Sequence, residues 1–364
     1  MAYLWQFYFL IGLVTLQGLL LVSGNNKSGK RLFLWLCFIE LVFIAGFRAW
    51  NIGADTPNYV GEFISAIAGR DWSGSHMESG YVLYTQFLAL FTSNPQAILV
   101  ANAFVITGAI LQTIRKYSPV VLLPVLLFVI LDYATTLNIL RQYMALAIVL
   151  LSFPFVVKRQ FVFFAISCLI ATTFHTSAIL AIGLYFIYPL KFKFKNLWWI
   201  MLATMVCFIL LAPIADQIIS LTGRYARYQG NILLGEETKV ASVIKTFVQL
   251  SIAGFCVFSY KFLYKEEMHK TKIGLPVSFL LWCSVISACL QFISIRGTVM
   301  ERLVIYFSTF NFLSVPFFVH CYPKKSRWLV VIILLVCFIA YRSIIFVYRP
   351  NWNPVLPFEF CFHL

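Results

Sequence analysis

Long apolar runs alternate with short polar connections along almost the whole chain, and this pattern predicts membrane-spanning helices. A helix needs about 20 apolar residues to cross a hydrocarbon core about 30 Å thick. The predicted spans are 3–22, 32–47, 96–114, 119–131, 139–157, 161–173, 175–190, 196–213, 246–262, 273–293, 302–320 and 328–347. The pattern therefore predicts an all-α, polytopic integral membrane protein with about twelve spans.

Some apolar segments are too short to cross a bilayer unaided. Segments 119–131 and 161–173 would span by recruiting flanking residues or in a locally thinned bilayer. The run Gly80–Phe91 ends at the polar residues "TSNP" and is predicted to form an interfacial or re-entrant helix instead.

Basic residues gather on alternate connections between the predicted spans. More than half of the 28 lysines and arginines lie in "NNKSGKR", "RKY", "KRQ", "KFKFK", "KFLYKEEMHKTK" and "YPKKSR". By the positive-inside rule these six loops are cytoplasmic, which places both ends of the chain and the remaining loops on the outer side. This assignment requires that Gly80–Phe91 does not span.

The composition agrees with one integral domain covering residues 1–364, with outer-face loops 48–95 and 214–245. The chain is 61% hydrophobic and 11% charged, a balance that no water-soluble domain has. Its net charge of +15 follows from basic cytoplasmic loops, so no nucleic-acid partner is expected. The nine cysteines lack metal-ligand spacing, and nucleotide-loop, HExxH, GxSxG and DxD motifs are missing, so no cofactor or metal is expected.

The inner loops hold nearly all the lysines, whereas the outer connections carry most of the remaining arginines together with carboxylates. In "FRAWNIGADTPNY", Gly53 frees the backbone to turn Asp55 back toward Arg48. In "LNILRQYMALAIVL", Arg141 and Gln142 stand at the outer end of an apolar helix, where the alternative for Arg141 is snorkelling to lipid headgroups. Because arginine binds phosphate oxygens in a bidentate fashion, this face is a candidate site for an anionic ligand.

Further candidates come from the second half of the chain. "LTGRYARYQGN" spaces Arg224 and Arg227 three residues apart with Tyr228 nearby, which suits a diphosphate or a sugar, although a solvated surface helix would look the same. "IRGTVMERLVIYF" adds Arg296 and Arg302, and its Glu301 is expected to pair with an arginine unless it serves the site.

Three other features have both a functional and a structural explanation. "TTFHTSAIL" places His175 at an outer helix end, where it is either functional or a hydrogen-bonded core residue. Glu40 is a carboxylate inside a predicted span, so it either serves a function or pairs with a facing helix. The tail "NWNPVLPFEF" is expected to cover a site or to lie on the membrane interface.

Seven short motifs occur in an order that resembles the EpsG-like branch of the Wzy polysaccharide polymerases. They are "FRAWNIGADTPNY", "MESGYVLY", "LNILRQYMALAI", "TFHTSAIL", "GRYARY", "ERLVIYF" and "NPVLPF". Two departures are small: Ser79 stands where proline is common, and Phe358 where the tail usually has tyrosine.

The resemblance implies a GT-C-like glycosyltransferase in the bacterial inner membrane that polymerises O-antigen, capsule or exopolysaccharide units. It would transfer the growing chain from undecaprenyl pyrophosphate to the non-reducing end of the next lipid-linked unit at the periplasmic face. Membrane lipids and a separate chain-length regulator are the other expected partners. Reactions of this type need no nucleotide, because the sugar-diphosphate bond supplies the energy.

The residues lead to a mechanistic hypothesis for such a transfer. Glu78, in the second motif, joins His175 and Asp55 as a candidate base for the acceptor hydroxyl, and His175 is preferred because the ordinary histidine pKa of about 6.5 suits proton transfer. The candidate substrate-binding residues are Arg48, Arg141, Gln142, Arg224, Arg227, Tyr228, Arg296 and Arg302. Two rival functions are a flippase for the lipid-linked oligosaccharide and a ligase that moves finished chains to a lipid acceptor.

Overall fold

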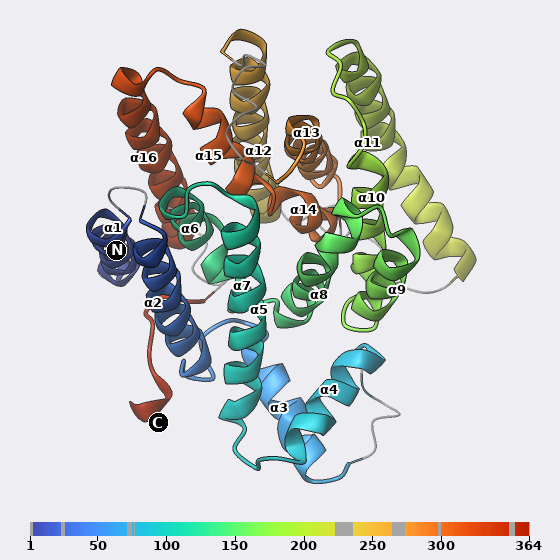
Figure 1. The fold of residues 1–364 in the computed structure, drawn as a ribbon. Coiled ribbons are helices and arrows are strands. Elements are labelled where there is room, and N and C mark those ends of the chain that lie inside the picture. Colours follow the sequence, from blue (N-terminus) through green and yellow to red (C-terminus); the bar gives the residue numbers. More distant parts are fainter. Residues whose placement is uncertain are drawn as a thin grey trace. The chain divides into compact units, whose positions relative to one another are not determined.

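The computed structural model of the chain is built from helices (Figure 1). It describes residues 3–22, 26–70, 75, 77–222, 236–263, 274–297, 300–348 and 354–363. Within these ranges there is no β-strand, and the extended pairing consists of an isolated antiparallel bridge between Arg48 and Phe360. The predicted all-helical class is therefore confirmed.

The chain divides into two compact units. The first unit comprises Met1–Ile179 together with Trp328–Leu364, and the second comprises Leu180–Arg327. The first unit is thus assembled from two segments that are far apart in the sequence. The prediction of one integral domain over 1–364 stays a prediction.

The first unit is organised around one long, largely buried helix, α5 (Gln96–Tyr117), which contacts α2 and α8. The elements around it are α1 (Leu4–Leu21), α2 (Lys27–Gly46), α3 (Thr56–Ile67), α4 (Ser79–Ala89), α6 (Leu122–Phe128), the π-helix η2 (Val129–Tyr133), α7 (Ala134–Thr136), α8 (Leu140–Val157), α9 (Phe161–Thr172), the start of η3 (Thr176–Ile182) and α16 (Lys324–Tyr348). From opposite ends of the sequence, α1 and α16 come together where the rings of Phe7 and Phe346 meet at 5.2 Å.

Helices α3 and α4 pack against each other at one end of α5 (Figure 1). They contain 12 and 11 residues. At 1.5 Å per residue, α4 is about 17 Å long, far short of the hydrocarbon thickness of about 30 Å. The structure therefore agrees with the expectation that Gly80–Phe91 does not cross the membrane as a helix.

In the second unit, α13 (Val277–Ile293) lies at the centre and contacts α11 (Lys195–Thr222), α12 (Glu236–Phe262) and α14 (Glu301–Ser308). The short α10 (Gly183–Ile187) precedes these helices, and α15 (Asn311–His320) follows α14 at a bend of 45°. At that break, Asn311 accepts a 2.7 Å hydrogen bond from Ser284 of α13. Such buried polar bonds hold helices together where apolar contact alone gives little preference in lipid.

Five helices among the described residues are long and apolar enough to cross a membrane: α1, α5, α8, Val240–Phe262 of α12, and α16. A sixth span results if α14 and α15 are counted as one bent span. On α16, apolar side chains such as Trp328 and Val336 are largely exposed, as on a helix surface that faces lipid. The chain is a membrane-embedded protein.

The predicted number of twelve spans is not established by these helices. All twelve predicted segments contain helix, but those at 119–131, 161–173, 175–190, 196–213 and 273–293 fall into the class of shorter apolar helices. The segment at 32–47 becomes α2, which carries Lys30, Arg31 and Glu40. The count of twelve therefore stays a prediction.

Extended residues of the tail form hydrogen bonds with the loop between α2 and α3 and with α1. The amide of Ala49 donates to the carbonyl of Glu359, the amide of Cys361 donates to Phe47, and the amide of Gly53 donates to Pro354, all between 2.8 and 2.9 Å. The side chain of Gln6 accepts a hydrogen bond from the Phe358 amide and donates one to its carbonyl. The tail thus ties the start of α1 to the end of α2.

Candidate functional site

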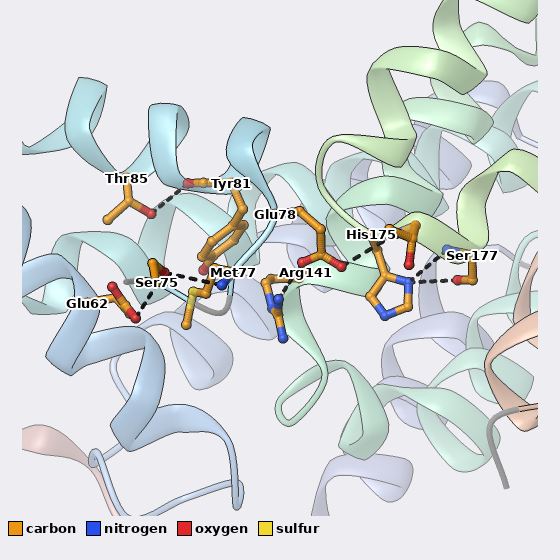
Figure 2. A network of polar contacts seen from close by, with 10 residues as sticks. Glu62, Ser75, Met77, Glu78, Tyr81, Thr85, Arg141, His175 and Ser177 are labelled. Carbon is orange, nitrogen blue, oxygen red and sulfur yellow. Dashed lines mark hydrogen bonds and ion pairs between the residues drawn. The ribbon is translucent and has the colours of Figure 1, made fainter. Parts of the chain in front are cut away.

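The centre of the candidate site is an ion pair between Arg141 and Glu78. Arg141 lies in the first turn of α8, and Glu78 immediately precedes α4, so the pair joins two helices 63 residues apart in the chain (Figure 2). Their side chains are 26% and 19% exposed, so the pair is half-buried and still reachable. The Nε atom of Arg141 is buried, and no described residue accepts its hydrogen bond.

The second carboxylate oxygen of Glu78 connects this pair to the segment that carries the histidine. It accepts a hydrogen bond of 3.4 Å from the amide of Thr176, at the first residue of η3 (Figure 2). Glu78 therefore bridges α8 and η3, and the three predicted residues Glu78, Arg141 and His175 lie in one neighbourhood of the first unit.

A glycine allows that neighbourhood to form. The amides of Gly80 and Tyr81 at the start of α4 both donate to the carbonyl of Thr173, at 2.8 and 3.3 Å. A β-carbon on Gly80 would lie 2.7 Å from the Thr173 Cβ and 2.9 Å from its carbonyl oxygen, which no real contact permits. In the motif "MESGYVLY", Gly80 is thus required by a close helix approach rather than by a turn.

Two tyrosines, Tyr59 of α3 and Tyr81 of α4, lie near Arg141, and the sequence analysis did not name them as site residues. Their rings lie 5.6 Å apart, and Tyr81 accepts a 3.1 Å hydrogen bond from Asn102 of α5. Burial raises the pKa of Tyr59; the charge of Arg141 opposes this rise, and Asp55 adds to it. Burial also raises the pKa of Tyr81 well above its ordinary value, so both phenols stay protonated at neutral pH. The signal was present in the first two motifs, because Tyr59 ends "FRAWNIGADTPNY" and Tyr81 follows Gly80 in "MESGYVLY".

Asp55 reaches the same neighbourhood through Tyr59. It directly precedes α3, and its amide donates to the side-chain oxygen of Asn138 at 3.0 Å. Both Asp55 and Arg141 act on the pKa of Tyr59, so both charged groups lie near this phenol. The turn before Asp55 contains Gly53 at a φ of +92°, as the sequence predicts for a flexible position.

His175 is 7% exposed and held by its neighbour two residues on. Its Nδ1 lies 2.7 Å from the Ser177 hydroxyl, and the Ser177 amide donates to the same nitrogen at 3.4 Å (Figure 2). His175 thus has the hydrogen bonds expected of a core histidine, and it also lies beside the residue that bonds to Glu78.

Arg48 occupies a different position from the one that a ligand-binding arginine requires. Its side chain is fully buried, and its guanidinium donates to the carbonyls of Ala45, Ile52 and Leu137 and to the Thr56 hydroxyl. Burial lowers its pKa to about 10, so it stays charged at neutral pH. In this structure Arg48 braces the turn between α2 and α3 and does not face Asp55 as the sequence analysis expected. Gln142 is also buried, at 3% exposure.

The remaining candidates lie elsewhere. In the second unit, Arg296 follows α13 and stacks on Phe208 with its guanidinium carbon 4.8 Å from the ring centre, and Arg302 is an exposed residue in the first turn of α14. Glu301 pairs with Lys245 of α12, not with an arginine as expected. Arg224, Arg227 and Tyr228 lie outside the described residues.

Two further sequence expectations can be compared with the described residues. Glu40 accepts a hydrogen bond from Gln17 of α1, which supports the explanation that it pairs with a facing helix. Across the described part of the chain, no three His, Cys, Asp or Glu side chains gather as a metal site.

These features define a class: an all-helical protein embedded in a membrane, with an arginine, carboxylates and a histidine gathered at one end of its first unit. Residues 31–360 match the model of the EpsG family, and the chain belongs to that family. Its members are exopolysaccharide and O-antigen polymerase-like proteins, so membership supports a polysaccharide-polymerase-like role and, broadly, glycosyltransferase activity. No curated protein and no solved structure matches the chain.

Proposed function

We propose that this protein polymerises a surface polysaccharide by transferring the growing glycan from undecaprenyl pyrophosphate to the non-reducing end of the next lipid-linked repeat unit. The reaction takes place at the periplasmic face of the bacterial inner membrane. Family membership supports the polymerase-like role, and the arrangement around Arg141 supports the identity of the donor.

The single observation that carries the proposal is the half-buried Arg141 with its unsatisfied Nε. One guanidinium nitrogen pairs with Glu78, while the buried Nε–H needs an acceptor. Because the Arg141 side chain is 26% exposed, a diphosphate that enters beside the ion pair can supply this acceptor. A hydrogen bond to a charged group is about twice as strong as a neutral one. Glu78 and Tyr59 hold the guanidinium in place, so little reorganisation is needed when the ligand binds.

The proposed transfer breaks the bond between the anomeric carbon and the diphosphate. Positive charge develops on the sugar and negative charge on the leaving diphosphate, which Arg141 stabilises. A base among Asp55, Glu78 and His175 takes the proton of the acceptor hydroxyl, a contribution of about a hundredfold or more. Gln142 supports Arg141 from the buried side, and Arg48 positions the segment that carries Asp55.

We assign the other arginines to the same substrate. Arg224, Arg227, Tyr228, Arg296 and Arg302 are proposed as substrate-binding residues. The proposal also includes a GT-C-like arrangement of twelve spans in one membrane domain, outer loops 48–95 and 214–245, no metal or nucleotide requirement, and a separate chain-length regulator as partner.

Deletion of the gene tests the proposal, with the surface polysaccharide separated on a gel. A polymerase predicts that the ladder of chain lengths disappears while single repeat units remain attached to their acceptor. A flippase predicts that the single-unit product also vanishes and that lipid-linked units accumulate on the cytoplasmic side. A ligase predicts that full-length chains persist on the lipid carrier.

Complementation then tests the site. Wild type restores the ladder, whereas Arg141→Ala restores none at normal protein level. Arg70→Ala is the matched control, because Arg70 is an exposed arginine just after α3. A wild-type ladder from Arg141→Ala would refute the role of Arg141.

A further inference from the structure

The hydrogen bonds around His175 decide which ring nitrogen carries its proton. A backbone amide only donates, so the bond from the Ser177 amide makes Nδ1 an acceptor. The Ser177 hydroxyl, 2.7 Å away, must then donate to Nδ1 as well. The proton of the neutral imidazole therefore resides on Nε2.

We propose that Ser177 is a positioning residue that holds His175 as the Nε2–H tautomer, so that His175 acts as a hydrogen-bond donor to the departing diphosphate and not as the base. This inference rests on the proposed function, because it assigns roles within the same transfer. A nitrogen that carries a proton cannot accept one from the acceptor hydroxyl. The lone pair at Nδ1, which could, is turned toward Ser177 (Figure 2).

The step balances with His175 in this role. The bond from the anomeric carbon to the diphosphate oxygen breaks, and its electron pair leaves on that oxygen. A bond from the anomeric carbon to the acceptor oxygen forms, and the acceptor proton moves to a carboxylate, for which Asp55 and Glu78 remain the candidates. Nε2–H donates a hydrogen bond to the departing oxygen and keeps its proton. This bond stabilises the leaving group in addition to the positive charge of Arg141.

The placement of the two donors supports this division of labour. Thr176, which stands between His175 and Ser177, donates its amide to Glu78, and Glu78 binds Arg141. The backbone directly after the histidine and the arginine side chain therefore bind the same carboxylate. Two donors held on one rigid network suit an anion better than a donor paired with a base would.

Side-chain substitutions separate a donor from a base. The amide nitrogen of glutamine lies near the position of Nε2 and donates, but it cannot accept a proton. We expect His175→Gln to polymerise within about tenfold of the wild-type rate. The rate of His175→Ala should fall on the order of a hundredfold. Equal loss in both variants at normal protein level would overturn the donor role.

A direct measurement of the tautomer does not depend on activity. In protein labelled with ¹⁵N in its five histidine rings and embedded in bilayers, solid-state NMR reads the protonation of each nitrogen. The difference from His175→Gln assigns the His175 signal, and about pH 8 keeps the ring neutral. We expect protonated Nε2 and unprotonated Nδ1; the opposite pattern would overturn the inference.

Ser177 is tested by the same two readouts. Ser177→Ala should mix the tautomers and slow polymerisation about tenfold, and Ser177→Thr, which keeps the hydroxyl, should restore both. Ser167→Ala is the matched control, since its hydroxyl bonds within α9 to the carbonyl of Phe163. If gene deletion leaves the ladder unchanged, the proposed function fails while the NMR result still decides the tautomer.

Discussion

The amide of Gly80 donates to the carbonyl of Thr173 at 2.8 Å, and this contact sets how closely α4 approaches the end of α9. Glu78 lies two residues before Gly80, and His175 lies two residues after Thr173. The distance between the carboxylate and the histidine segment therefore depends on a backbone contact with no room for a methyl group.

Gly80→Ala is expected to abolish most activity and to destabilise the protein. The new β-carbon would meet the Thr173 backbone oxygen at 2.9 Å, and overpacking of this kind costs about 1–3 kcal/mol. Thermal unfolding in detergent and the polysaccharide ladder measure the two effects. Gly61→Ala in α3 is the control, since its β-carbon would meet nothing within 4 Å; a Gly80→Ala protein as active and stable as this control would contradict the prediction.

Arg48→Lys is expected to unfold the turn between α2 and α3, although the charge is kept. A lysine cannot reach the carbonyls of Ala45, Ile52 and Leu137 together, and each buried carbonyl without a donor costs about 1–3 kcal/mol. The measurements are the protein level in membranes and the unfolding temperature. Arg141→Ala should leave both near wild type, and the same pattern for Arg48→Lys would show that Arg48 has no bracing role.

Removing residues 354–364 is expected to loosen the segment that holds Arg48. The amides of Ala49 and Gly53 lose their acceptors on Glu359 and Pro354. Hydrogen exchange should speed up in peptides covering residues 47–55, because these amides then depend on water for their hydrogen bonds. Peptides from the buried helix α5 should stay protected, and unchanged exchange at 47–55 would rule out a fastening role for the tail.

Exchanging the charges of Lys245 and Glu301 is expected to restore the stability that is lost when either charge alone is reversed. The two side chains are 22% and 20% exposed, so Lys245→Glu places two carboxylates together in a half-buried position. A double-mutant cycle on the free energy of unfolding should give a coupling energy of about 0.5–3 kcal/mol between the two positions. Additive effects in the reversed double variant would mean that the pair does not connect α12 to α14.

Periodicity was enough to predict the long apolar helices, because an apolar run in lipid has to satisfy its own backbone, but α3 at Thr56–Ile67 was not predicted within the outer loop 48–95. Each predicted span contains helix. The length of each span was less predictable: 175–190 reads as one apolar run, yet it begins as the 3₁₀ segment η3 and continues in α10. How many helices cross the bilayer depends on tilt and packing, which hydropathy does not encode.

The site was predictable by residue type but not by partner. Arg48 and Arg141 read alike as outer arginines, yet one is fully buried against carbonyls and the other is half-exposed beside Glu78. Their difference comes from contacts with Leu137 and Glu78, which are 89 and 63 residues away in sequence. The bond between Ser177 and His175 is local, and the motif "TFHTSAIL" could have revealed it.

The contacts of the tail also determine when the N-terminal part of the fold can form during synthesis. Gln6 bonds to Phe358, 352 residues later, and Arg48 forms an antiparallel bridge with Phe360. A ribosome releases α1, α2 and the arginine of their loop long before the residues that cover them. The segment carrying Asp55 therefore lacks its hydrogen bonds to the tail until the residues after α16 have been synthesised.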